Sequence, residues 1–482
     1  MTPHCNRIED VSRLSRREAL LRAGSGFGIV ALNSLLNQEI LAYSPSTGAI
    51  PQFAAKAKRI IWLFMGGGVS HVDTFDPKPL LQKHHRKKIP IKLPSHLRDG
   101  SNKVLASPFK FQHYGQSGLP ISELFPHMAR HADKFCVLRS MHCDSIDHTG
   151  ATLQTFCGAV SLPRPGIGNW LLYGLGTENN NLPGYVVMGP DQQSGTATYS
   201  PRFLPTWTSG TRVNWGYRPD MKAENAIPNL KNAGNLTAAE QQTQLALLKK
   251  LNGAYAADRV QTDPLSARTQ SYELAFRMQA AAPEAFDITG ETEITKKMYG
   301  LDDSHSQSFG YRCLLARRLA ERGVRFIQVQ CGKGDGLDWD QHGELEKGHR
   351  KNAAATDKPV GALLSDLEAR GLLNDTLVIW GGEFGRTMYC QGQLSSTNYG
   401  RDHHPRCFTI WMAGGGIRPG MSWGQTDDFS YNIASDPVEV HDLHATMLHL
   451  LGIDHRRLTF RFQGRDHRLT DVHGHVVRQL LA

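Results

Sequence analysis

The sequence has 482 residues, of which 40% are hydrophobic and 21% are charged, and its formal net charge at pH 7 is +9. These fractions exclude an intrinsically disordered chain, a collagen-like fibre and a coiled coil. No run reaches the roughly 18 consecutive apolar residues of a membrane span. The unusual feature is the number of histidines, 22, some of which are candidate metal ligands.

The first 57 residues are predicted to be a twin-arginine signal peptide and a linker. Arg16-Arg17 precede a glycine- and alanine-rich, moderately apolar stretch from Leu20 to Leu36, which is typical of that signal. The pattern predicts export to the periplasm or the extracellular space. Residues 1–57 therefore stay outside the fold prediction, and residues 58–482 are expected to form the folded domain.

Strands and helices alternate along residues 58–482. Apolar β-branched runs predict strands at 59–65, 135–138, 184–188, 324–329, 376–380 and 407–412. Helices are expected at 121–131, 237–256, 264–281, 308–322, 357–370 and 438–451. Residues 191–302 change character and are predicted to form an inserted cap. The alternation predicts an α/β fold with a large, mainly parallel sheet and helices on both faces.

The basic run at residues 83–88 is interpreted as a solvated loop. The excess of positive charge is consistent with an anionic partner. A nucleic-acid partner is not expected, because the sequence has no zinc-finger, RNA-recognition or helix-turn-helix signature.

Carboxylates and imidazoles follow several of the predicted strands, where ligands bind in open α/β sheets. The segments concerned are 66–76, 330–342, 381–387 and 400–405. Oxygen and nitrogen donors of this kind favour a hydrolytic zinc, manganese or mixed two-metal centre. Each motif alone also fits a tight turn, a hydrogen-bonded loop pair or a helix first-turn acid. Their joint placement at one edge of the sheet favours a site.

The same segments resemble a known family. Residues 64–79, 339–342, 382–387, 400–405 and 441–455 are similar to the motifs of the domain of unknown function 1501 family, which is sulfatase-like and placed with the alkaline phosphatase superfamily. The resemblance implies an α/β core, a metal site at the carboxyl ends of the strands, and hydrolysis of phosphate or sulfate esters, including those of sulfated polysaccharides. It also implies divalent metal ions, two in number, with zinc, manganese and calcium as the candidates.

The resemblance also implies a ligand set. The expected metal ligands are Asp73, Asp340, His342, Glu383, and His403 or His404. Asp76 is an alternative to Asp73. Phe384 stands after Glu383, where the superfamily has a histidine. His71 and His148 lie in similar strand-end loops and are further candidates.

The expected catalytic residues include a hydroxyl nucleophile. Thr149 lies at a predicted helix start that favours anions, and Ser70 competes with it. In a third alternative, a metal-activated water attacks directly. Arg386 and Lys78 are expected to neutralise the anionic group. None of the eight cysteines lies in the C-x-P-x-R pattern, so a formylglycine mechanism is not expected.

The predicted function is therefore an exported, metal-dependent hydrolase of sulfate or phosphate esters. The alternative is a non-catalytic extracytoplasmic binding or scaffold protein built on a degenerate hydrolase core. The missing histidine after Glu383 and the open choice of nucleophile favour that alternative.

Overall fold

A computed structural model describes most of the chain after the predicted signal segment. The described residues are 51–90, 103–191, 194–214, 216–217, 225–228, 230, 236–257 and 263–482. Most of the predicted signal and linker, residues 1–50, lies outside them.

The core of the fold is a nine-stranded sheet in the order β12-β4-β11-β8-β1-β7-β5-β6, with β15 also paired to β4. These strands are β12 (Met421–Trp423), β4 (Cys136–His142), β11 (Phe408–Ala413), β8 (Thr376–Gly381), β1 (Arg59–Met65), β7 (Phe326–Cys331), β5 (Tyr185–Met188), β6 (Thr211–Arg212) and β15 (Val438–Glu439). All neighbours are parallel except β11, which is antiparallel to β8 and to β4. The carboxyl ends of β1, β4, β7 and β8 therefore lie at one edge.

Strand β1 shows why the sheet is covered on both faces. Ile61, Leu63 and Met65 belong to one hydrophobic core, and their neighbours Trp62 and Phe64 belong to another. Successive side chains of a strand point to opposite faces, so a strand buried on both sides reads as an unbroken apolar run.

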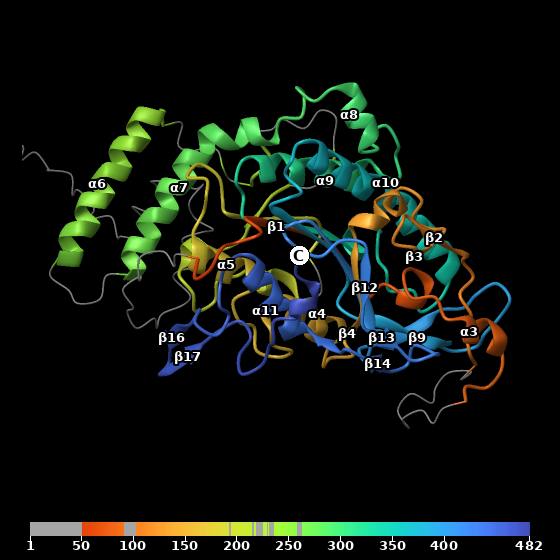
Figure 1. Cartoon of the computed structure of the whole chain (residues 1–482). Coiled ribbons are helices and arrows are strands. Elements are labelled where there is room, and N and C mark those ends of the chain that lie inside the picture. The colour runs from red at the N-terminus through yellow and green to blue at the C-terminus, as the bar shows by residue number, and fades with distance from the viewer. Residues whose placement is uncertain are drawn as a thin grey trace, which may run out of the picture.

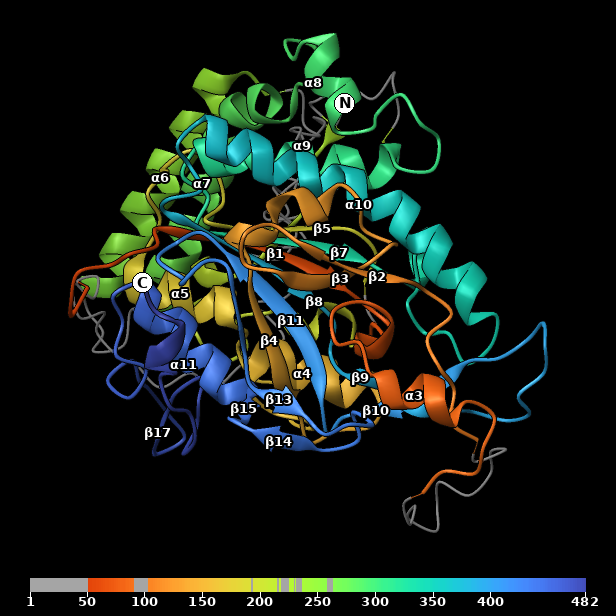
Figure 2. The ribbon, with the colours of Figure 1, turned by 45° about the vertical axis from the view of Figure 1, so that its right-hand side comes forward.

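The two cores lie under different helices (Figure 2). The first core is covered by α9 (Gln307–Glu321) and α10 (Leu345–Ala369), with α7 (Asp263–Phe286) packed beside them. The second is covered by α4 (His148–Cys157), α5 (Ile167–Leu175) and α11 (Val440–Leu450). The α/β prediction is thereby confirmed.

The region between β5 and α9 contains α6 (Ala238–Ala257), α7 and α8 (Glu293–Met298). Helix α6 packs on α7, and the pair projects from the side of the molecule away from the hairpin of β9 (Gly385–Cys390) and β10 (Arg401–His404) (Figure 1). Smaller elements complete the fold: α3 (Pro79–His84), β2 (Phe111–Tyr114), β3 (Leu119–Ser122), β13 (Gln425–Thr426), β14 (Ile433–Ser435), β16 (Phe460–Phe462) and β17 (Arg465–His467).

Two of the predicted helices differ from the observed elements. Residues 121–131 do not form a helix: β3 ends at Ser122, and a 3-10 helix follows at Met128–Lys134. Helix α10 begins at Leu345 rather than at the expected residue 357, and Pro359 lies inside it. Within the described residues, no helix has the length and apolar character needed to cross a membrane.

Candidate metal centre

Four side chains from three separate segments meet at the carboxyl edge of the sheet. They are His148, Asp340, His342 and His403, called here the His–Asp cluster. His148 is the first residue of α4, and the side chain of Asp147 caps that helix by accepting the Gly150 N–H at 2.9 Å. Asp340 and His342 follow β7, and His403 lies in β10.

The donor atoms of the cluster converge. Asp340 Oδ1 lies 2.9 Å from His342 Nε2 and 3.2 Å from His403 Nε2. Asp340 Oδ2 lies 3.2 Å from His148 Nε2. The His342 and His403 Nε2 atoms are 3.0 Å apart. Around a tetrahedral zinc with bonds of about 2.0–2.1 Å, neighbouring ligand atoms are about 3.4 Å apart, so these spacings suit one ion.

The chemistry of the donors also fits a cation. His148, Asp340 and His403 each offer a ligand atom, and these atoms lie within 4.8 Å of one another. The His148 Nε2 atom is buried and lies 3.2 Å from Asp340 Oδ2. A cation would bind this nitrogen and the nearby His403 Nε2 atom together.

Glu383 supports the cluster from behind. Its Oε1 atom accepts hydrogen bonds from the Gly67 N–H at 3.0 Å and from His148 Nδ1 at 2.7 Å. A carboxylate on Nδ1 fixes the imidazole tautomer and directs the Nε2 lone pair toward a metal. The Glu383 Oε2 atom is buried and has no hydrogen-bond partner in the described structure.

Arg386 holds Asp340 in place. Its guanidinium is buried and contacts Asp340 Oδ1 at 2.5 Å. It also donates to the carbonyl oxygens of Gly67, Gly68 and Arg401. The predicted role of Arg386, neutralising a substrate, stays untested, and its observed contacts are those of a positioning residue.

Two glycines permit the close approach of these segments. Gly67 has φ +106°, and a Cβ there would lie 2.4 Å from Asp338 Oδ1 and 2.6 Å from the Asp340 nitrogen. A Cβ at Gly400 would lie 2.1 Å from the His342 carbonyl carbon. Any larger residue at either position would displace the loop that carries Asp340 and His342.

The electrostatics follow from this crowding. Burial alone would raise the pKa of Asp340, but hydrogen bonds from the three imidazoles hold it well below its usual range. Burial would lower the pKa of His148, but Asp340 and Glu383 raise it to about 9. Burial raises the pKa of Asp338, and the neighbouring Asp340 adds to the effect.

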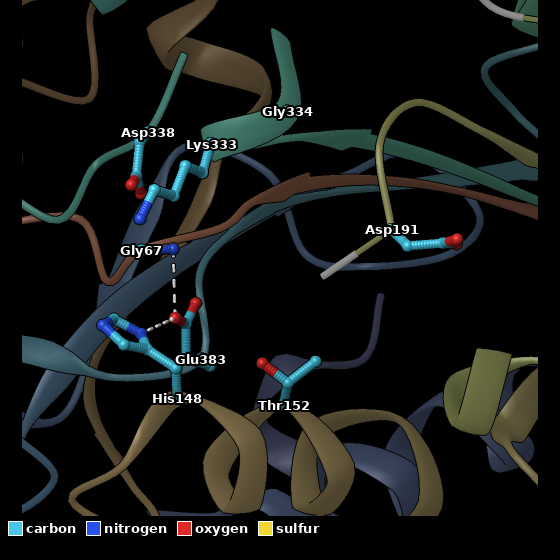
Figure 3. Close-up of a pocket in the computed structure, with 8 residues that line it drawn as sticks. All are labelled: Gly67, His148, Thr152, Asp191, Lys333, Gly334, Asp338 and Glu383. Atoms are coloured by element: carbon cyan, nitrogen blue, oxygen red, sulfur yellow. Dashed lines mark hydrogen bonds and ion pairs between the residues drawn. The ribbon is translucent and has the colours of Figure 1, made fainter. Parts of the chain in front are cut away.

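A cavity of about 280 Å³ adjoins the cluster (Figure 3). Its lining residues are Gly67, His148, Thr152, Asp191, Lys333, Gly334, Asp338 and Glu383. Lys333 is exposed and makes no ion pair in the described part of the chain. It adds a cationic group to a cavity whose other lining residues are His148, three acidic residues and three neutral ones.

The structure does not bring Asp73 into the cluster. Its carboxylate is buried and forms a bidentate pair with Arg401, at 2.7 and 3.1 Å. Ser70, the alternative nucleophile, donates its hydroxyl to Asp73 Oδ2 at 2.5 Å. Asp76 pairs with Lys78 at 3.1 Å. These side chains satisfy one another rather than lining the cavity.

Two other candidates lie apart from the cavity lining. The buried His404 ring stacks on Tyr431, and its Nε2 contacts the Tyr431 carbonyl at 2.9 Å. Thr149 is half-buried in the first turn of α4, beside His148. Phe384 packs against His148 and His403, with ring centroids 4.9 and 4.7 Å apart.

Sequence reasoning did not select Lys333 and Thr152, and it left His148 among the further candidates. His148 is the first residue of α4 and follows soon after the carboxyl end of β4, so its place near a strand end carried the signal. Thr152 lies one helical turn later on the same face. Lys333 follows β7 directly.

The fold and the cluster define an α/β protein with a candidate metal centre at the carboxyl edge of its sheet. The chain belongs to the family described as "Protein of unknown function (DUF1501)", whose sequence model matches residues 57–481. The predicted family is thereby confirmed. No curated protein gives a significant sequence match.

The chain is also similar to solved structures at low sequence identity. One is an alkaline phosphatase from the Antarctic bacterium TAB5, with 11% identity, TM-score 0.30, and coverage of 82% of this chain and 98% of that one. Another is Ps i-CgsB in complex with k-i-k-neocarrahexaose, with 11% identity, TM-score 0.35, and coverage of 82% and 72%. A third is the lipoteichoic acid synthase LtaP from Listeria monocytogenes, with 8% identity, TM-score 0.35, and coverage of 88% and 78%.

Proposed function

We propose that this protein is an exported, divalent-metal-dependent hydrolase of phosphate or sulfate esters. The observation that carries the proposal is the convergence of three imidazole nitrogens and one carboxylate beside a cavity that contains Lys333. The donor set supports a metal, and the lysine supports an anionic substrate.

The ligands of the metal would be His148, Asp340, His342 and His403. Imidazole-rich sets suit zinc, whereas calcium prefers oxygen ligands. A divalent cation here would polarise an ester oxygen as a Lewis acid. We assign one ion rather than the two predicted, because Phe384 packs against the cluster and Glu383 Oε1 is engaged by Gly67 and His148.

The roles of the other residues follow from their contacts. Lys333 would bind a non-bridging oxygen of the phosphate or sulfate. Hydrolysis joins a water oxygen to phosphorus or sulfur, breaks the bond to the alkoxy oxygen, and leaves the alcohol with a water proton. We assign the attack to water, because neither Thr149 nor Ser70 lines the cavity.

The test combines metal analysis with turnover. Wild-type protein loaded with zinc or manganese is expected to hold about one ion per chain and to hydrolyse 4-nitrophenyl phosphate or sulfate. Asp340→Asn should lose both properties, whereas the control Asp466→Asn, on the exposed hairpin of β17, should keep both. A wild-type protein that takes up neither metal, or that takes it up and hydrolyses no ester, would overturn the proposal.

The second candidate function is a non-catalytic binding protein. The packing of Phe384 against His148 and His403 favours it, because an aromatic ring closes one side of the cluster to substrate. Stoichiometric metal without turnover of any aryl or sugar ester, together with binding of a neutral oligosaccharide, would select this candidate.

Export has its own test. The proposal is supported by Arg16-Arg17 and the apolar stretch that follows, which lie outside the described residues. Replacing both arginines by lysine (R16K/R17K) should leave the full-length protein in the cytoplasmic fraction, whereas wild type should reach the periplasm. Equal distribution of the two would contradict twin-arginine export.

A further inference from the structure

Two depressions with contrasting linings adjoin the His–Asp cluster. The cavity beside His148 carries charged side chains, among them Lys333 and Asp338. A second depression of about 330 Å³ is lined by His342, Gly343, Gln391, Gln393, Ser395, Asn398 and Tyr399. No lysine, arginine, aspartate or glutamate is among those lining residues. The cluster thus contributes one histidine to a charged depression and another to a neutral one.

The neutral depression is fixed to the cluster by the chain itself. Its loop, residues 391–400, joins β9 to β10, and β10 also carries His403. Gln391 contacts His342 Nδ1 through its side-chain oxygen. The close approach of Gly400 to His342 holds the loop against the segment that carries the metal ligands.

Hydrogen bonds within the loop leave some amide groups available. Ser395 Oγ donates to the Asn398 carbonyl and accepts from the Asn398 N–H, each at 2.7 Å. Asn398 Oδ1 accepts from the Glu344 N–H at 2.9 Å. The Gln393 side chain and the Asn398 Nδ2 group have no hydrogen-bond partner among the described residues, and Gln393 is exposed.

This lining suits a neutral ligand that is rich in hydroxyls. Amides both donate and accept hydrogen bonds without carrying charge, and Tyr399 adds a half-buried ring. The volume lies within the usual range of small-molecule sites, about 300–1,000 Å³. A charged group would gain no ion pair here from the lining residues.

We infer that this depression is a subsite for a sugar, which forms the alcohol side of the ester. The inference rests on the proposed function and deepens it: the anionic group lies by Lys333 and the sugar lies by Gln393, with the His–Asp cluster at the bond between them. The protein is therefore expected to prefer phosphate or sulfate esters of sugars over aryl esters.

The test separates sugar binding from hydrolysis. Zinc-loaded wild type, Gln393→Leu and the control Thr397→Val are compared by saturation-transfer NMR with maltotriose, cellotriose and neoagarotetraose. Thr397 is exposed on the same loop and does not line the depression. We expect at least one sugar to bind wild type and the control. Gln393→Leu should bind about 2–10-fold more weakly, which is the effect of one neutral hydrogen bond.

Turnover supplies the second readout. Gln393→Leu should lower kcat/KM for the phosphate or sulfate ester of the sugar that binds by a similar factor, whereas the control Thr397→Val should leave it unchanged. If a sugar binds but no ester is hydrolysed, the result contradicts the proposed function and supports the subsite. Aryl-ester hydrolysis without binding of any of the sugars would remove the subsite alone, as would equal sugar affinity of wild type and Gln393→Leu.

Discussion

Two polar clusters that both take a residue from strand β10 differ in how their carboxylates are paired. The first is the His–Asp cluster. The second, called here the buried network, consists of Ser70, Asp73, Asp76, Lys78, Arg401, Thr426 and Ser430. Strand β10 supplies Arg401 to the network and His403 to the cluster. Residue type and position at a strand end therefore do not distinguish a ligand set from a structural pair.

The difference lies in what each carboxylate faces. Asp73 faces Arg401, whose guanidinium can only donate hydrogen bonds, so the pair is neutral and complete. Burial alone would raise the pKa of the Asp73 carboxyl. The charge and hydrogen bonds of Arg401 outweigh burial and hold this pKa below its usual value, so the carboxyl stays ionised. Asp340 also pairs with a buried guanidinium, that of Arg386, but three imidazole nitrogens surround it as well, and nitrogen donors of this kind suit a cation. The buried network stabilises the fold, and the His–Asp cluster is available for a ligand.

The largest expected effect is on stability and comes from a substitution that disrupts the buried network. Arg401→Met removes the only cation in contact with Asp73 among the described residues and leaves that carboxylate buried without its partner. The free energy of unfolding should fall by about 3–5 kcal/mol, as measured by urea denaturation. Arg350→Met, at an exposed pair with Glu346, should cost about 1 kcal/mol or less. Equal effects of the two substitutions would contradict the distinction.

The next largest expected effect tests whether the His–Asp cluster binds a metal ion. Glu383→Gln should lower zinc affinity about 10–100-fold, because Glu383 orients His148 through Nδ1. The measurement is competition with a chromophoric chelator. Glu439→Gln is a matched control, since Glu439 contacts His441 Nδ1 at the same 2.7 Å outside the cluster. Zinc affinity that is unchanged in Glu383→Gln would show that Glu383 does not position a metal ligand.

Much of the fold could be predicted from the sequence, because burial on both faces leaves a direct pattern. The strand at 59–65 was predicted with the bounds of β1, since its apolar run ends at three glycines. The predicted helix at 121–131 is wrong, because apolar residues there pack as a short strand and a 3-10 turn. A local sequence pattern cannot distinguish a helix from a short strand where tertiary packing determines which of the two forms.

Less of the candidate site could be predicted. The sequence predicted a site at the carboxyl edge from its carboxylates and imidazoles, and the structure places Asp340, His342, His403 and Glu383 near one another there. It could not show that Arg401 pairs with Asp73, because the two residues are distant in the chain. The same holds for Lys333, whose role depends on which residues line the cavity beside it.

A smaller effect concerns substrate. Lys333→Ala should lower kcat/KM for a phosphate or sulfate ester about 10–100-fold, because a hydrogen bond to a charged group contributes about 1.5–3 kcal/mol. Metal content should not change, since Lys333 lines the cavity without contacting the His–Asp cluster in the described structure. Lys347→Ala, at an exposed pair with Glu344, is the control. Unchanged kinetics in Lys333→Ala would place the anion elsewhere.

The hydroxyl candidates give a smaller effect still. If water attacks directly, Thr149→Ala should lower turnover less than about tenfold, because Thr149 acts only through the first turn of α4. Thr295→Ala, on the exposed helix α8, controls for the loss of a helical threonine. A covalent phosphoryl or sulfuryl intermediate trapped on Thr149, or a loss of several orders of magnitude, would contradict direct attack by water.

A further effect, which depends on pH, is a change in the stability of the region beside the buried network. Burial lowers the pKa of His404 to about 3, so its neutral form is favoured in the folded state. The resulting stability is present above the unfolded pKa of about 6.5 and is lost as pH falls toward 3, by up to about 1.4 kcal/mol per pH unit.

His404→Gln can still donate to the Tyr431 carbonyl. Urea midpoints at pH 4–7 should therefore fall less steeply in His404→Gln than in wild type, whereas the exposed His305→Gln should match wild type. Parallel slopes for all three proteins would show that His404 is not held neutral by burial.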